Sequence, residues 1–269
     1  MTNPDVTQVT SRDNPLLKDL RKLAQDPGAY RKLGRIWLEG DHLCRAARER
    51  GVRPAIAIFA ESLWETARVQ WAGCADKTVV MPDALLQGIS GLESPAPMGF
   101  VLDLPAPAAV AADAPTVVLD RLQDAGNVGS VLRSAAAFGF KQVIALKGTA
   151  ALWAPKVLRA GMGAHFGLRL IEGADIAALD TLAVPLLATS SHDGQWLHEA
   201  QARRTLPNPC AWLLGHEGQG VSHELQSRAT HLIRIVQPGG EESLNVAAAA
   251  AICLHASAAG SVETLIARL

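Results

Sequence analysis

Two kinds of hydrophobic pattern divide the chain. In the first part, leucines at helical spacing among basic residues predict a helix over 14–23, and the short apolar run that follows Gly34 predicts a strand over 35–40. The alternation continues, with helices expected over 41–50, 62–71 and 82–88 and strands over 55–60, 78–81 and 99–104. Helices and strands that alternate in this way indicate a small α/β domain over residues 1–104.

The second part has longer apolar runs that do not alternate with polar residues. Strands are expected over 116–120, 142–147, 185–190, 211–215 and 231–235, with helical patterns between them. Such runs indicate strands of a parallel sheet that is buried on both faces, in a second domain over residues 116–269. Residues 105–115, with three prolines and many alanines, are predicted to be a linker.

Composition adds a charge asymmetry to this picture. Residues 1–53 carry 11 Lys and Arg against 7 Asp and Glu, a formal charge of +4, while the chain as a whole has −1. This end is therefore expected to face phosphates, although a solvated helix surface would show the same pattern. No membrane span or signal peptide is evident, which predicts a cytoplasmic protein. The four scattered cysteines have neither disulfide nor zinc spacing, so no metal is expected.

Three loops at predicted strand ends carry the candidate chemistry, because ligands of parallel sheets bind at the carboxyl ends of strands. In the first loop, Asn127 fits the N-cap of a helix over 128–138, and Arg133 then lies near the start of that helix. The glycines at 126 and 129 allow close approach of a ligand or another backbone. Asn127 as a simple cap and Arg133 as a simple surface charge are the plainer interpretation.

The second loop, GHEGQG over residues 215–220, surrounds Glu217 with glycines. It exposes backbone N–H and C=O groups, but it also suits an ordinary tight turn. No Lys-Ser or Lys-Thr pair follows it, so it is not a phosphate-binding P-loop. Another glycine cluster, over 161–167, follows a helical segment instead of a strand and is not expected to bind a dinucleotide.

The third loop runs from a Pro-Gly-Gly turn into an almost wholly apolar helix that begins near Val246. Ser243 or Asn245 can cap this helix. The alanines at 247–251 allow close packing against the sheet or against another subunit.

Together the three loops resemble the motifs of the SpoU/TrmH-like (SPOUT) RNA 2′-O-ribose methyltransferases. The first motif is matched by Asn127, Gly129 and Arg133, and the second by GHEGQG. The third is matched by Ile235 followed by Ser-Leu-Asn at 243–245, although Val236 stands where the family often has proline. Residues 35–43 resemble the family's N-terminal L30e-like substrate-binding domain.

The resemblance implies an α/β-knot fold, in which the C-terminal chain is threaded through a loop of the parallel sheet as a deep trefoil knot. It implies S-adenosylmethionine as the cofactor, bound at Gly215, Ile235, Leu244 and Asn245. It also implies a homodimer formed through the C-terminal domain.

The implied reaction is methyl transfer to a ribose 2′-hydroxyl of structured RNA. Arg133 is expected to anchor a phosphate and stabilise developing alkoxide charge, because a guanidinium keeps its proton and cannot serve as a free base. The residues expected to position Arg133, the ribose and the cofactor are Asn127, Glu217, Ser243 and Asn245. Ribosomal RNA of the 23S type is favoured over transfer RNA, and a non-catalytic RNA-binding protein that keeps the fold is the alternative.

Overall fold

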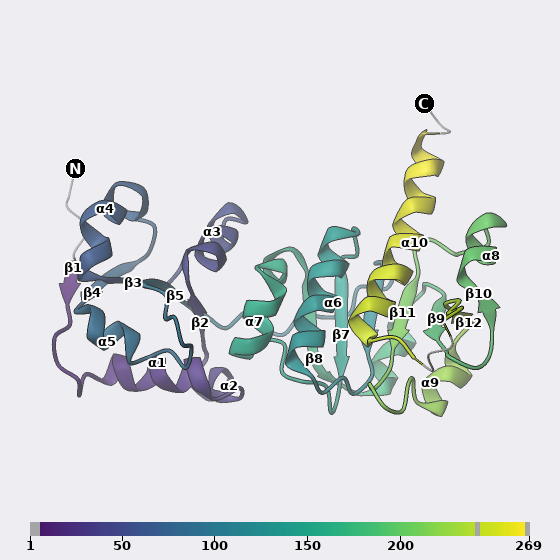
Figure 1. Ribbon diagram of the computed structural model, residues 1–269, viewed down its shortest axis with the longest axis horizontal. Helices are drawn as coiled ribbons and strands as arrows, with labels where there is room; N and C mark the ends of the chain where they lie inside the picture. Colours follow the sequence, from purple (N-terminus) through teal and green to yellow (C-terminus); the bar gives the residue numbers. More distant parts are fainter. Residues whose placement is uncertain (1–5, 240–242, 267–269) are drawn as a thin grey trace. The chain divides into compact units, whose positions relative to one another are not determined.

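The structure, a computed structural model, describes residues 6–239 and 243–266 (Figure 1). The chain forms two compact units. The first comprises the residues up to Ala106 together with Trp153–Phe166, and the second comprises Pro107–Leu152 and the residues from Gly167 onward.

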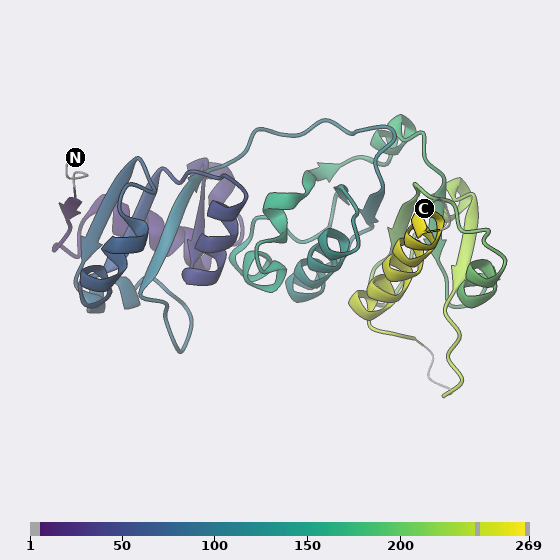
Figure 2. The same cartoon turned by 90° about the horizontal axis from the view of Figure 1, so that it is seen from above.

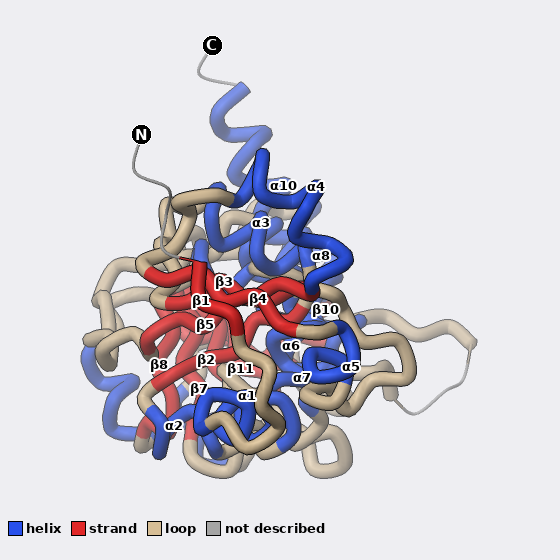
Figure 3. The backbone as a smooth tube through the Cα atoms, turned by 90° about the vertical axis from the view of Figure 1, so that its left-hand side faces the viewer, coloured by secondary structure: helices blue, strands red, loops and turns tan. Residues whose placement is uncertain are grey.

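The first unit contains a mixed five-stranded sheet (Figure 3). Its strand order is β1-β4-β3-β5-β2, with β1, β4 and β3 parallel and with β5 antiparallel to both β3 and β2. The strands are β1 (Val6–Gln8), β2 (Arg35–Glu39), β3 (Ile56–Ala60), β4 (Lys77–Met81) and β5 (Met98–Asp103). The helices are α1 (Pro15–Gln25), α2 (Ala29–Leu33), α3 (Asp41–Glu49), α4 (Glu61–Trp71), α5 (Asp83–Gln87) and α7 (Pro155–Gly161).

The second unit is built on a seven-stranded sheet in which every pairing is parallel. The strand order is β10-β12-β9-β11-β6-β7-β8. The strands are β6 (Thr116–Leu119), β7 (Gln142–Leu146), β8 (Arg169–Ala174), β9 (Leu186–Thr189), β10 (Gln195–Trp196), β11 (Ala211–Leu214) and β12 (His231–Arg234). The helices are α6 (Ala125–Ala137), η1 (Ala164–Gly167, of which the last residue falls in this unit), η2 (Ile176–Thr181), α8 (Leu197–Ala202), α9 (His223–Arg228) and α10 (Val246–Ile266).

Successive side chains of the central strands point to opposite faces of the sheet, and both faces are buried. Leu213 of β11 lies in a cluster with Val118 of β6 and Leu225 of α9. Trp212, one position earlier, donates its indole N–H to Ser257 Oγ of α10 at 2.9 Å, on the opposite face. Helix α10 also packs along α6 (Figure 2). Burial on both faces explains why these strands are apolar throughout.

The predicted α/β class with a parallel sheet is confirmed, and all five predicted strands of the second unit are parallel neighbours in one sheet. Two strands were not predicted there. Strand β8 at one edge has half-exposed side chains and reads as RLIEGA, and β10 at the other edge has only two residues. Edge strands of this kind lack the continuous apolar run that identifies a buried strand.

Candidate functional site

The site lies at the point in the second unit's sheet where the order of the strands reverses. From β6 the chain proceeds to β7 and β8 on one side, whereas β11, β9, β12 and β10 lie on the other. Neighbouring strands β6 and β11 run parallel with Leu119 beside Leu214, so the loops that follow them leave the same edge together. Such a switch point is where open α/β sheets bind ligands.

The loop after β6 ends at an N-cap that the sequence interpretation misplaced. Asp124, and not Asn127, caps α6, because its Oδ1 accepts a 2.7 Å hydrogen bond from the Asn127 backbone N–H. Asn127 is the third residue of the helix. Its side chain is therefore released from capping and is available for contacts with other loops.

The side chains of Asn127, Glu217 and Asn245 form a relay that joins the three loops. Asn245 Nδ2 donates to Asn127 Oδ1 at 3.0 Å, and Asn127 Nδ2 donates to Glu217 Oε1 at 3.3 Å. Asn245 Oδ1 accepts from the backbone N–H of Ala247 at 2.9 Å, so Asn245 is the residue that caps α10. Each amide thus has one possible orientation, and the relay runs in a single direction toward the carboxylate.

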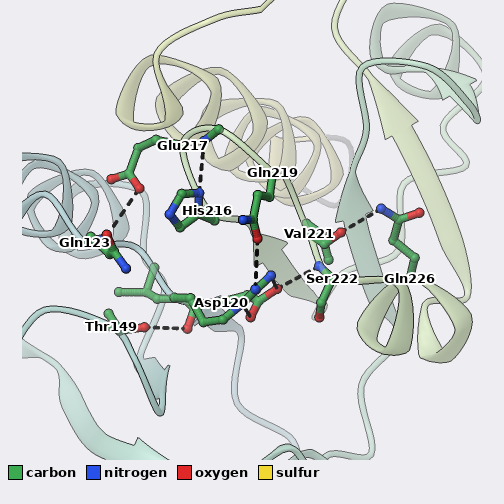
Figure 4. A network of polar contacts seen from close by, with 12 residues as sticks. Asp120, Gln123, Thr149, His216, Glu217, Gln219, Val221, Ser222 and Gln226 are labelled. Carbon is green, nitrogen blue, oxygen red and sulfur yellow. Dashed lines mark hydrogen bonds and ion pairs between the residues drawn. The ribbon is translucent and has the colours of Figure 1, made fainter.

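Glu217 ties the second loop to the first. Besides the bond from Asn127, its carboxylate accepts from the backbone N–H of Gln123 at 3.3 Å (Figure 4) and from that of Asp124 at 3.2 Å. Burial raises the pKa of Glu217, but hydrogen bonds from its own backbone, from Asn127 and from the 123–124 backbone lower it more, so the pKa lies below its ordinary value. Glu217 is an ionised anchor and a weak base.

The second loop closes on itself around Gly215. A Cβ at this position would overlap the backbone of Gly220 and Val221. Gly220 N–H donates to His216 O at 2.8 Å, and His216 Nδ1 accepts from Gly218 N–H at 3.0 Å (Figure 4). The histidine side chain therefore shapes the turn, as expected of a polar loop residue. Only glycine fits where the turn begins.

Asp120 and Arg121, which the sequence interpretation did not select, bind the same loop through hydrogen bonds from the end of β6. Asp120 is buried at the end of β6 and accepts from Ser222 N–H at 2.7 Å (Figure 4). Arg121 donates to Asp120 Oδ1 at 2.9 Å and to Gln219 Oε1 at 3.1 Å. A charged residue that directly follows an apolar strand run is the signal that could have identified Asp120.

The third loop presents the remaining cofactor candidates. Ile235 follows β12 directly and is half-buried, while Leu244 is 39% exposed next to the relay residue Asn245. Ser243 is exposed and has no hydrogen bond within the described part of the chain. Gln237 Oε1 is buried and finds no partner among the described residues.

Arg133 lies apart from the relay. It is the ninth of the 13 residues of α6, further along than the sequence suggested, and it is exposed. It lies six positions after Asn127, which places its side chain roughly 120° away around the helix. Its guanidinium has no ion pair or hydrogen bond to any residue that the structure describes.

Metal and thiol chemistry find no support in the described residues. No group of three or more His, Cys, Asp or Glu side chains there could hold a metal ion. Burial raises the pKa of all four thiols, to about 11 for Cys210 and about 12 for Cys253, so none is a ready nucleophile. Within residues 6–239 and 243–266, no helix combines the length and apolarity of a membrane span.

Comparisons with known proteins show that the chain is similar to RNA methyltransferases. The model of the SpoU rRNA Methylase family matches residues 114–255. A protein from Synechocystis named as an uncharacterized tRNA/rRNA methyltransferase is 31% identical over 268 residues, 93% of each chain. The Bacillus subtilis 23S rRNA (guanosine(2553)-2′-O)-methyltransferase RlmP is 26% identical and covers 92% of this chain and 98% of its own. The structure of an AdoMet-bound rRNA methyltransferase from Sinorhizobium meliloti superposes with a TM-score of 0.79 at 25% identity, covering 94% of this chain and 97% of that one.

Proposed function

Because the chain belongs to the SpoU rRNA Methylase family, we propose that it transfers a methyl group from S-adenosylmethionine to a ribose 2′-hydroxyl of ribosomal RNA at the three-loop site. It is an RNA methyltransferase with S-adenosylmethionine as its methyl donor. The observation that carries the proposal is the relay Asn245–Asn127–Glu217, which holds three loops together at the switch point of the sheet.

Ribosomal RNA is the substrate that the relatives favour. The Bacillus protein that covers nearly the whole chain is named for a guanosine of 23S rRNA. The +4 charge of residues 1–53 supplies phosphate-binding capacity to residues 1–104, which we propose to be an L30e-like RNA-binding domain. We also propose a cytoplasmic location.

The residues of the second and third loops fit the cofactor. The turn at Gly215–Gly220 exposes backbone groups, and Val236 and Leu244 offer apolar side chains that are 50% and 39% exposed. The unpartnered Gln237 Oε1 is an acceptor suited to an amine or hydroxyl of a bound ligand. We therefore assign cofactor binding to the loops containing Gly215, Ile235, Leu244 and Asn245. When bound, the cofactor supplies a sulfonium methyl group to the attacking ribose oxygen.

The protein's own residues divide the remaining tasks. Glu217 already accepts three hydrogen bonds and has a lowered pKa, so it orients Asn127 and the 123–124 backbone and is not the base. Arg133, exposed and without a described partner, is free to bind an RNA phosphate and to stabilise charge developing on the 2′-oxygen. The hydroxyl proton then leaves to phosphate or water. Ser243, exposed beside Leu244, remains the candidate for contact with the ribose.

A second copy of the chain fits the exposed side of the helix pair α6 and α10. These helices pack on each other, and their outward residues are largely small or apolar. They are Ser130, Arg133 and Ala137 on α6 and Ala248, Ile252 and His255 on α10. We propose that a homodimer forms here and that Arg133 consequently lies at the edge of the interface. We also propose that the C-terminal chain is threaded through a loop of the parallel sheet as a deep trefoil knot.

Transfer of radiolabelled methyl from S-adenosylmethionine to ribosomal RNA tests the proposal. Fully unmodified 23S rRNA should accept one methyl per molecule in a ribose, identified by its resistance to alkaline hydrolysis, and transfer RNA should accept none. RNA binding without transfer would support the alternative, a non-catalytic RNA-binding protein. Transfer to tRNA alone would overturn the choice of substrate.

A further inference from the structure

We infer that Asp120 and Arg121 form a positioning pair that holds the turn 215–222 in its cofactor-binding shape. The inference rests on the proposed function, in which backbone groups of this turn bind S-adenosylmethionine. The pair lies outside the three motifs, and its role follows from the contacts that it makes.

Asp120 stands beside the first residue of the turn. The pairing of β6 with β11 sets Leu119 opposite Leu214, and the Asp120 N–H continues that ladder with a 2.8 Å hydrogen bond to Leu214 O. The backbone of Asp120 therefore runs alongside the entry to Gly215. Its side chain is only 3% exposed, which puts the carboxylate beneath the turn.

The same residue also holds the end of the turn. Asp120 Oδ2 accepts from the Ser222 backbone N–H at 2.7 Å (Figure 4). The backbone of Asp120 thus fixes where the turn begins, and its carboxylate fixes where it ends. Because Gly215 leaves no room for a Cβ against Gly220 and Val221, a small shift at either end would open the closed turn.

Arg121 connects this anchor to the middle of the turn. Its backbone is in the left-handed region, with φ at 59°, a conformation that residues with a Cβ rarely adopt. In this conformation the guanidinium folds back onto Asp120, with Nε 2.9 Å from Oδ1 and Nη2 3.4 Å from Oδ2. Nη1 reaches Gln219 Oε1 at 3.1 Å. Three points of the turn are therefore held by two consecutive residues.

The charges of the pair depend on each other. Burial raises the pKa of Asp120, but hydrogen bonds from Arg121 and Ser222 lower it more, so the carboxylate stays ionised near neutral pH. Within the described residues, no hydrogen bond or ion pair joins either side chain to Asn127 or Arg133. The pair is therefore expected to act on cofactor affinity and to leave the RNA steps unchanged.

Two substitutions test the pair, one at the buried Asp120 and one at the exposed Gln219. Asp120→Asn keeps the shape of the side chain but sets an NH₂ group against a donor, either of Arg121 or of Ser222. Gln219→Ala removes only the exposed contact to Arg121 and leaves the core untouched. Asp180→Asn is the matched control, since it removes an ion pair of 2.6 Å with Arg228 on the surface of the same unit.

Calorimetry with S-adenosylmethionine and steady-state methyl transfer to 23S rRNA give the readouts. Asp120→Asn should raise the Kd for the cofactor about tenfold, and Gln219→Ala about threefold, with the binding stoichiometry and KM for RNA unchanged. At saturating cofactor, kcat should stay within about threefold of the unaltered chain. A purely structural role would instead lower the stoichiometry without moving the Kd of the folded fraction.

The outcomes separate this inference from the function on which it rests. Unchanged Kd values in both variants, with tight binding by the unaltered chain, would overturn the positioning role alone. No saturable binding by the unaltered chain would overturn the assignment of the cofactor site and this inference with it. If Asp120→Asn does not fold, Gln219→Ala decides the question, because Gln219 is exposed and lies outside the core.

Discussion

Asn245 donates from Nδ2 to Asn127 Oδ1 over 3.0 Å while its own Oδ1 caps α10, so one side chain connects a helix start to the site. The residues are 118 positions apart in the sequence. The backbone N–H groups of α10 can only donate, which fixes the orientation of Asn245 and, through it, that of Asn127. The first N–H groups of α10 therefore determine which amide of the site donates and which accepts.

Asn245→Asp separates these two functions of the side chain. Aspartate still accepts from the Ala247 N–H and preserves the cap, but it cannot donate to Asn127 Oδ1. We expect kcat/KM for methyl transfer to fall at least tenfold, because two acceptors then face each other, with Tm changed by no more than a few degrees.

Asn14→Asp provides the control for this substitution. Asn14 caps α1 by accepting from Leu16 N–H at 2.9 Å, and it lies in the other unit. This variant should keep full activity. Unchanged activity in Asn245→Asp would show that the donor side of the relay is dispensable.

Gly215→Ala and Gly218→Ala should differ sharply although they are three residues apart in one turn. A Cβ at Gly215 would overlap the backbone of Gly220, whereas a Cβ at Gly218 would meet only the His216 ring at an ordinary 3.8 Å. Gly215→Ala should abolish saturable binding of S-adenosylmethionine, and Gly218→Ala should change the Kd less than threefold. Calorimetry measures both, and equal effects would contradict the role of the closed turn.

The sequence predicted the strand framework because the central strands are buried on both faces. In runs such as 116–120 and 142–147 every inner position is apolar, which distinguishes them from surface helices and loops. It also predicted that the candidate residues follow strand ends. The edge strand β8 escaped prediction because its side chains are half-exposed.

The sequence could not predict how the site residues bond. Asp124 and Asn127 are both good capping residues, and only the structure shows that the former caps α6 and the latter faces Glu217. The contact between Asp120 and Ser222 joins residues 102 positions apart and depends on the pairing of β6 with β11. Contacts of this kind follow from the order of strands in the sheet, which hydrophobic periodicity does not encode.

Acid should weaken the fold partly through Asp120, whose pKa in the folded protein lies below its ordinary value. A group with a lowered folded pKa contributes stability that is full above its unfolded pKa of about 3.9 and is lost as the pH falls through the folded value. The free energy of unfolding of Asp120→Asn should therefore lie below that of the unaltered chain at pH 6, and the difference should shrink below roughly pH 4. Urea titrations across this range measure it, and a constant difference would contradict the assignment.

Arg133→Ala should leave the Kd for S-adenosylmethionine within about twofold and reduce kcat at least 100-fold, a loss expected when a transition-state charge is no longer stabilised. Arg133→Lys should recover little of this if the forked guanidinium is needed to bind phosphate. Arg203→Ala, which removes an exposed arginine paired with Glu199, is the control and should be fully active. Single-turnover methyl transfer measures the chemical step, and normal turnover in Arg133→Ala would remove this residue from the reaction.

Lys18 and Lys22 offer a test of RNA binding by the first unit. They lie one helical turn apart on the exposed side of α1, whose other side buries Leu17 and Leu20 in the core. Reversing both charges, in Lys18→Glu with Lys22→Glu, should weaken binding of 23S rRNA and make its dependence on salt shallower, because fewer counterions are released.

The matched control is Lys77→Glu, an exposed lysine at the start of β4 in the same unit. We expect the double reversal to make the negative slope of log K against log salt less steep by about 2. The Kd for S-adenosylmethionine should be unchanged, because the cofactor loops belong to the second unit. Filter binding at several salt concentrations measures the slope. If Lys77→Glu weakens binding as much as the double reversal does, α1 is not the RNA-binding face, and only the overall charge of the unit attracts the RNA.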